Sequence, residues 1–308
     1  MMPRALNCIV VVCTLVFVLG GMFSLACAET ECDHHPDAWW YLECQISFGP
    51  RNPGSVGHVQ VREFLCAELL NYADSVEVQE FEVVYEGKEY EMANISAFFQ
   101  SASGESEPYV ILSAHFDTRP RAEHDPDPLL RSTPIIGAND GASGVAVLME
   151  IAGVLATRRP PVPIKLMFFD GEDFGSSVDM MFLGSRRLAA TIDPSQIRYM
   201  ILLDMVGDAE LDIFIEGYSY SSAPQLIDAV WNSAASMGYE SVFHNEVQNW
   251  ILDDHLPFIN RGIPSIDIID FDYPFWHTTS DTIDKCSKES LSVVRNVILD
   301  VVFDSPII

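Results

Sequence analysis

The sequence predicts an α/β protein whose largely parallel sheet is covered by helices on both faces. The first reason is that, after residue 100, short apolar runs alternate with longer helical patterns. The predicted strands span residues 109–114, 164–169, 199–203, 211–215 and 264–269, and the predicted helices span about 141–157, 179–190, 223–237 and 289–302. The second reason is that acidic residues and histidines follow most of these strands, where open α/β sheets bind their ligands.

The first 28 residues predict an export segment. Arg4 is their only charged residue, an apolar stretch runs from Ala5 to Leu25, and Ala26-Cys27-Ala28 fits a signal-peptide cleavage site. Because the apolar stretch is long for a signal peptide, an uncleaved membrane anchor is the alternative. We therefore expect an exported protein, either periplasmic, secreted or at the cell surface, in which residues 29–308 form a single domain.

Residues 32–99 predict two helices and a β-hairpin that starts the sheet. The helices span residues 32–47 and 57–72, where apolar side chains recur at near-helical spacing. Residues 76–85 alternate between apolar and polar, Glu86-Gly-Lys forms a turn, and residues 90–99 return as the second strand. A long loop with four prolines follows later, over residues 118–139, and loops of this length are commonly functional.

The composition of the chain limits the kinds of molecule that it can bind. The 308 residues are 48% hydrophobic, which is enough for the core of one large α/β domain. A net charge of −28 excludes nucleic acids and anionic membrane surfaces as partners, because both require basic patches. Four cysteines follow the export segment, and either two disulfides or buried thiols are compatible with them. They are Cys32, Cys44, Cys66 and Cys286.

Two of the strand ends predict metal ligands. His115 and Asp117 project to the same side of an extended chain, which suits a metal ligand and a carboxylate that orients it. Glu172 and Asp173 are adjacent, so one can bind a metal while the other acts as a general base.

Three further residues extend this set. Asp140 lies among small residues that let the backbone approach an ion, although an aspartate there also suits a helix N-cap. Asp204 follows four apolar residues, where a carboxylate is costly unless it is paired or ligated. His277 is a candidate ligand, and Trp276 before it is a candidate pocket wall.

Taken together, these motifs resemble those of the zinc-dependent glutaminyl cyclases, which are members of metallopeptidase family 28. The resemblance runs from about Phe48 to Ser290. It is carried by His115-Phe-Asp117, Gly137-Ala-Asn-Asp140, Phe168-Phe-Asp-Gly-Glu-Asp173, Leu202-Leu-Asp204, Asp253-Asp-His255 and Trp276-His-Thr278. It implies a three-layer α/β/α sandwich with a mixed, mostly parallel sheet.

The resemblance also implies roles for individual residues. Asp140, Asp173 and His277 would bind one zinc ion, and Glu172 would be the acid/base. Asp204 and Asp254 would be catalytic carboxylates, and Trp276 would line the substrate pocket, together with Phe275. The implied reaction converts the N-terminal glutamine of peptides or proteins to pyroglutamate with release of ammonia. Asp173 departs from the pattern, since animal cyclases carry a glutamate there.

Two alternatives stay open. Added to Asp140, Asp173 and His277, the pair His115 and Asp204 also completes the ligand set of a two-zinc aminopeptidase, in which Asp140 bridges the metals. The second alternative is an exported binding protein whose site has degenerated.

Overall fold

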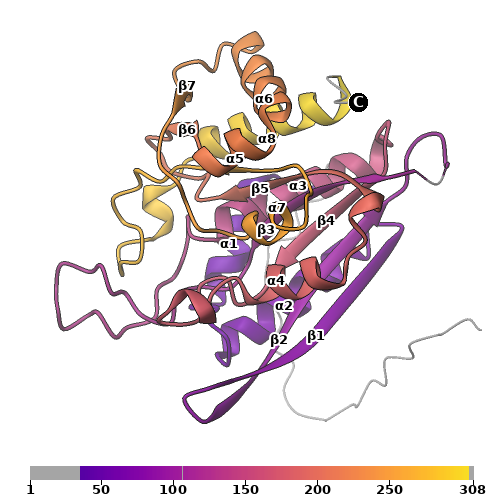
Figure 1. The fold of residues 1–308 in the computed structure, drawn as a ribbon. Helices are drawn as coiled ribbons and strands as arrows, with labels where there is room; N and C mark the ends of the chain where they lie inside the picture. The colour runs from indigo at the N-terminus through magenta and orange to yellow at the C-terminus, as the bar shows by residue number, and fades with distance from the viewer. Residues whose placement is uncertain (1–34, 106, 305–308) are drawn as a thin grey trace, which may run out of the picture. The chain divides into compact units, whose positions relative to one another are not determined.

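The computed structural model describes residues 35–105 and 107–304, and their centre is a six-stranded mixed sheet (Figure 1). The predicted export segment, Cys32 and the start of the helix predicted from residue 32 lie outside the described residues. Within the part that is described, no helix is both long and apolar enough to cross a membrane.

The sheet has the strand order β1-β2-β4-β3-β5-β8. The first two strands form the predicted antiparallel hairpin at one edge, and β2 also pairs antiparallel with β4. From β4 onward all pairings are parallel, so four strands end at the same edge of the sheet. The strands are β1 (Ser75–Tyr85), β2 (Lys88–Phe99), β3 (Tyr109–His115), β4 (Ile164–Phe169), β5 (Ile197–Asp204) and β8 (Ser265–Ile269).

Polar side chains cap the N-termini of several helices. Asp37, Ser55 and Ser287 each accept a hydrogen bond from a backbone N–H in the first turn of the helix that follows. The helices are α1 (Ala38–Ser47), α2 (Val56–Leu69), α3 (Ala142–Thr157), α4 (Leu183–Thr191), α5 (Gly217–Ser222), α6 (Pro224–Ser236), α7 (Leu256–Ile259) and α8 (Lys288–Phe303). Short 3₁₀ turns span Val178–Met180, Pro194–Gln196 and Ile283–Lys285.

Alternate side chains of each central strand enter different cores. Leu112 of β3 packs in the larger core, together with residues of α1, α3, α6 and α8. Ile111, its neighbour in the chain, packs in a second core with Ala189 of α4 and Phe258 of α7. Because strand side chains alternate between the two faces, helices cover both sides of the sheet. The expected three-layer α/β/α sandwich is confirmed.

Three predicted elements differ from the structure. The helix predicted over residues 32–47 begins only at Ala38, where the extended residue Asp37 caps α1. The strand predicted over residues 211–215 is β6 (Ile213–Ile215), which pairs with β7 (Phe243–Val247) in a separate two-stranded sheet. There the backbone N–H of Asp212 donates to the Asp270 carboxylate instead of joining the main ladder. The helix predicted over residues 179–190 starts only at Leu183, because Phe182 has a left-handed backbone with φ of 57°.

Two of the four cysteines that follow the export segment are described without a disulfide. Cys66 and Cys286 are free thiols, and Cys286 is buried, as expected for cysteines that pack as small apolar residues. Of the two alternatives that the sequence left open, Cys66 and Cys286 therefore follow the one without a disulfide.

Candidate active site and metal centre

The parallel half of the sheet gathers the predicted ligands at one edge. His115 ends β3, Asp204 ends β5, and the loop after β4 carries Glu172 and Asp173. Register explains the convergence, because His115 lies opposite Phe169 at the end of β4. The remaining two predicted ligands, Asp140 and His277, come from the loop before α3 and the loop after β8.

One group of potential ligands consists of Asp140, Asp173 and His277. All three are buried, and one ligand atom from each lies within 4.8 Å of the others. His277 Nε2 is 3.1 Å from Asp173 Oδ1 and 3.6 Å from Asp140 Oδ2. His277 has a left-handed backbone with φ of 54°, a conformation that costs free energy and is common at functional sites.

A second group shares one residue with the first. It consists of His115, Asp140 and Asp204, and their ligand atoms also lie within 4.8 Å of one another. His115 Nε2 is 3.3 Å from Asp140 Oδ1 and 3.3 Å from Asp204 Oδ1. Asp140 therefore stands between the two groups, as a bridging ligand would.

The first group fits a metal ion. Asp140 Oδ2 and Asp173 Oδ2 are buried and accept no hydrogen bond. A buried charged oxygen without a donor is costly, and a cation placed between these atoms would remove that cost. Two carboxylates and an imidazole are ligands that zinc takes in catalytic sites, where a further position stays open.

The charges of the first group also suit a cation. Burial opposes ionisation of His277, but Asp173 raises the pKa of this imidazole to about 10. Burial likewise opposes ionisation of Asp173, yet His277 lowers the pKa of that carboxyl below its usual value. Burial and the charge of Asp173 raise the pKa of Asp140 to about 7. A metal ion would therefore displace a proton from His277 when it binds.

Glu172 lies beside the ligands without belonging to either group. It is buried, and its Oε2 is 3.8 Å from His115 Nδ1. Burial, followed by the charge of Asp173, raises the pKa of the Glu172 carboxyl well above its usual range. A nearby cation would oppose this shift, and the carboxyl lies where it could give and take a proton beside the ligands.

Asp117 contacts the backbone of the ligand turn more closely than it contacts His115. Its Oδ1 is 3.6 Å from His115 Nδ1, beyond hydrogen-bond distance, and this nitrogen has no hydrogen-bond partner among the described residues. The two Asp117 oxygens accept hydrogen bonds from the backbone N–H groups of Glu172 (3.1 Å) and Asp173 (3.3 Å). Asp117 therefore orients the turn that carries both carboxylates.

A cavity of about 40 Å³, here called the central cavity, opens onto these groups. Trp276 lines it as predicted, and its ring stacks on His277 with 4.1 Å between the centroids. Phe275 is not among the lining residues, because its ring packs against Tyr273 and beneath the Lys285 ammonium. Other apolar side chains complete the walls, namely Met181, Met205, Ile251, Leu252, Ile269 and Phe271.

The adjacent aspartates before α7 differ in their surroundings. Asp253 lines the central cavity, whereas Asp254, which the resemblance makes catalytic, does not. Asp254 is buried and accepts a short hydrogen bond from the Ser185 hydroxyl. Burial raises the pKa of both carboxyls, that of Asp254 to about 7.

Several residues that hold the site were not predicted from the sequence. Asp281 accepts hydrogen bonds from the backbone N–H groups of Asn139 and Asp140, so it positions the shared ligand. Arg119 donates to the backbone oxygen of Asp173, and Glu123 lies 3.5 Å from His277 Nδ1. Only the length of the loop over residues 118–139 pointed to a functional role for the segment that contains Arg119 and Glu123.

A buried arginine also holds both ends of the loop over residues 118–139 by hydrogen bonds. Arg51 is fully buried, and its guanidinium donates to the backbone oxygens of Phe116, Ile136 and Gly137. Gly137 has φ of 66°, and a Cβ there would lie 2.2 Å from the Asp140 backbone oxygen. The close approach of these backbones therefore requires glycine at this position.

With this geometry in view, comparison with known proteins identifies the family. Residues 94–302, more than half of the 308-residue chain, match the sequence profile of peptidase family M28. The chain belongs to this family. M28 enzymes are zinc-dependent, which agrees with the ligand groups described above.

Solved structures of M28 type resemble the chain along most of its length. A glutaminyl cyclase from Bacteroides thetaiotaomicron is 36% identical with a TM-score of 0.81, covering 87% of this chain and 97% of that one. A leucine aminopeptidase precursor from the same species is also 36% identical, with a TM-score of 0.82, covering 87% and 96%.

Curated M28-type relatives are more distant. The glutaminyl-peptide cyclotransferase of Drosophila melanogaster is 27% identical over 80% of this chain and 75% of its own length. The bovine glutaminyl-peptide cyclotransferase-like protein is 27% identical, and the match spans only 66% of its length.

Proposed function

We propose that this M28 protein is a zinc-dependent glutaminyl-peptide cyclotransferase. The reaction closes the α-amine of an N-terminal glutamine onto its own side-chain carboxamide, forms pyroglutamate and releases ammonia. Asp140, Asp173 and His277 would hold the zinc ion. The bound ion would supply Lewis-acid polarisation of the carboxamide oxygen.

The remaining chemistry falls to the chain itself. Glu172 would take a proton from the attacking α-amine and return it to the departing ammonia. Asp204 and Asp253, which line the same cavity, would hold the amine and the leaving nitrogen by hydrogen bonds. The reaction consumes no water, so the apolar wall formed by Trp276 and Phe271 would favour it by excluding competing solvent.

The observation that carries this proposal is the position of Glu172. It is a buried carboxyl beside a ligand group with two unsatisfied carboxylate oxygens, and it lines a small cavity with apolar walls. Such a site suits a substrate whose own α-amine attacks its own side chain, without a second reactant. The glutaminyl cyclases among the similar structures support the same assignment.

The second group of ligands favours an alternative. His115, Asp140 and Asp204 could hold a second metal ion, and similar structures include a leucine aminopeptidase precursor. A two-metal exopeptidase would use Glu172 to activate a water molecule and would release the first amino acid of a peptide.

Metal analysis combined with two activity assays separates these functions. The cyclotransferase should hold about one zinc ion per chain and release ammonia from glutaminyl peptides, with little free leucine from leucyl peptides. Two zinc ions per chain with efficient release of leucine would establish the exopeptidase instead. One zinc ion with neither activity would favour a binding protein with a degenerate site.

We also propose that the catalytic domain spans residues 29–308 and is exported. The predicted cleavage site after Ala28 and the apolar stretch before it support this. Amino-terminal sequencing of the protein from its native source would distinguish cleavage after Ala28 from a retained anchor.

A further inference from the structure

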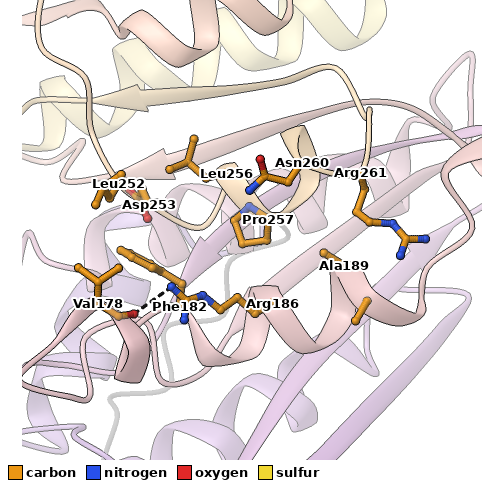
Figure 2. A pocket seen from close by; sticks show the side chains of 11 residues that line it. Val178, Phe182, Arg186, Ala189, Leu252, Asp253, Leu256, Pro257, Asn260 and Arg261 are labelled. Carbon is orange, nitrogen blue, oxygen red and sulfur yellow. Dashed lines mark hydrogen bonds between the residues drawn. The ribbon is translucent and has the colours of Figure 1, made fainter.

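A second and larger cavity lies next to the central one. It has a volume of about 370 Å³ and lies between α4 and α7, and it is called here the α4–α7 cavity (Figure 2). Leu252 and Asp253 line both cavities, and Met181 of the central cavity is followed directly by Phe182 of the larger one. A ligand that leaves the central cavity on this side would therefore meet the α4–α7 cavity first.

The walls of this cavity are mostly apolar. Phe182, Ala189, Leu256 and Pro257 form them, and Val178 and Leu252 lie at the rim with 46% and 47% of their surface exposed. In Figure 2, Val178, Phe182 and Leu252 lie at one end and Arg261 at the other. Exposed apolar side chains around a concave surface are typical of a binding site.

Two arginines add positive charge. Arg186 donates to the backbone oxygens of Val178 (2.9 Å) and Asp179 (3.3 Å), and Arg261 donates to that of Ile192 (3.3 Å). None of the ion pairs within residues 35–105 and 107–304 includes either guanidinium, although Arg261 interacts with the charge of Asp193 and the buried Asp253 lines the same cavity. The chain has 45 acidic and only 17 basic residues, so two arginines outside any ion pair give this cavity an unusual local concentration of positive charge.

We propose that the α4–α7 cavity binds the part of the peptide substrate that follows the N-terminal glutamine, and that it selects peptides carrying a carboxylate there. The proposal rests on the cyclotransferase function proposed above. An apolar residue next to the glutamine would lie against Phe182 and Leu256, and the carboxylate would meet Arg186 or Arg261. An acidic side chain and the peptide's own carboxyl terminus offer the same chemistry.

The location of the two arginines makes the preference measurable. Arginine binds carboxylates through charge-assisted hydrogen bonds, which are stronger than neutral ones. Arg261 is exposed and Arg186 is half-buried, so solvent limits the attraction to the range of exposed ion pairs. We expect kcat/KM to favour an acidic peptide over its neutral twin roughly three- to tenfold.

The test compares twin peptides on the zinc-loaded full-length enzyme. Each pair has glutamine first, one apolar residue second, and then glutamate or glutamine at position three, four or five, with an amidated carboxyl terminus. A further neutral pair carries a free or an amidated terminus and so distinguishes a terminal carboxylate from an acidic side chain. The dipeptide amide of glutamine and alanine carries no carboxylate and only a methyl side chain in its second residue, so it reports the basal reaction.

Two variants connect the preference to the cavity. In Arg261→Gln the kcat/KM of the acidic peptide divided by that of its neutral twin should fall to a value between about one and three. In Arg261→Glu, peptides that carry lysine in place of glutamate should become the favoured substrates. Arg187→Gln is the matched control, because Arg187 is likewise an exposed arginine but packs over Phe81, outside this cavity. This control removes the same charge and should keep the wild-type ratio.

Each outcome of these assays either supports or overturns the proposed selectivity for acidic peptides. Equal kcat/KM for acidic and neutral twins, with the dipeptide amide still cyclised, would overturn this inference and leave the proposed function intact. A preference that survives in Arg261→Glu, or that is lost equally in Arg187→Gln, would also overturn it. Absence of ammonia release from every substrate, including the dipeptide amide, would overturn the proposed function itself.

Discussion

At the scale of single residues, the separation of roles between Glu172 and the metal ligands is the most direct feature to test. Glu172 lines the central cavity but belongs to neither ligand group. Replacing its carboxyl with an amide keeps the shape and removes the proton transfer. The expected consequence is therefore catalytic and leaves the metal in place.

We predict that Glu172→Gln keeps its full zinc content and loses about a hundred- to ten-thousandfold in kcat. Zinc is measured by elemental analysis and turnover by ammonia release from a glutaminyl peptide. Asp254→Asn provides the comparison, because Asp254 is bonded to Ser185 and does not line the cavity, so its loss should affect folding stability more than turnover. Near-normal turnover in Glu172→Gln would remove this residue from the mechanism.

A second prediction at this scale concerns Glu216. Burial opposes its ionisation, but His255, at 3.2 Å, and the backbone N–H groups of Tyr218 and Ser219 lower its pKa from 4.5 to about 2. A lowered pKa means that the ionised form stabilises the folded state above about pH 4.5, and that this contribution disappears as the pH falls to about 2.

Glu216→Gln should therefore lower the free energy of unfolding at pH 7 by up to roughly 3 kcal/mol. The difference from the wild type should shrink as the pH falls from 4.5 towards 2. Urea unfolding with a chelator present, at several pH values, measures it without a contribution from zinc. A difference that stays constant with pH would show that the charge of Glu216 is not responsible.

At the scale of elements, the packing of α3 on the sheet places Asp140 beside His115. Gly144, in the first turn of α3, allows this approach, because a Cβ there would lie 2.1 Å from the Leu203 backbone oxygen in β5. Gly141 acts similarly, since a Cβ there would lie 2.3 Å from His115 Nε2. Small residues at the start of α3 are therefore a requirement of the site and of the helix–sheet contact.

We predict that Gly144→Ala destabilises the fold by about 2 kcal/mol, because overpacking against the backbone exceeds the gain in helix propensity. Gly153→Ala in the same helix is the comparison, since the nearest atoms to its Cβ would belong to the His35 side chain, near the start of the described residues, and not to the backbone of the sheet. Urea unfolding of both variants tests the contrast. Equal stability of the two variants would contradict the tight contact between α3 and β5.

At the scale of the whole molecule, the proposed metal ligands come from three separate loops, so a bound ion would connect distant parts of the chain. Asp140 precedes α3, Asp173 follows β4 and His277 follows β8. Any ligand that binds only the folded state stabilises that state by mass action. The metal centre is therefore expected to contribute to stability as well as to catalysis.

Removing zinc with a chelator should lower Tm by roughly 5–10 °C when free zinc was at about a hundred times its Kd. Adding zinc back should restore it. His277→Ala should lose its zinc and show little response to the chelator, whereas His244→Ala, on β7, should respond like the wild type. Full zinc content in purified His277→Ala would show that His277 is not a ligand.

The sequence alone determined the order of strands and helices and the presence of acidic residues and histidines after the parallel strands. These predictions succeed because periodicity and strand ends are local properties of the chain. The strand Phe243–Val247 escaped prediction, because its residues carry no apolar alternation.

Only the tertiary structure decided which of several residues close together in the sequence face the central cavity. Asp253 and Phe271 line it, while Asp254 and Phe275 do not. It also assigned Asp281 to the support of Asp140. Loops have no repeating period, so the direction of a side chain within them depends on contacts with segments far away in the sequence, and these contacts exist only in the folded chain.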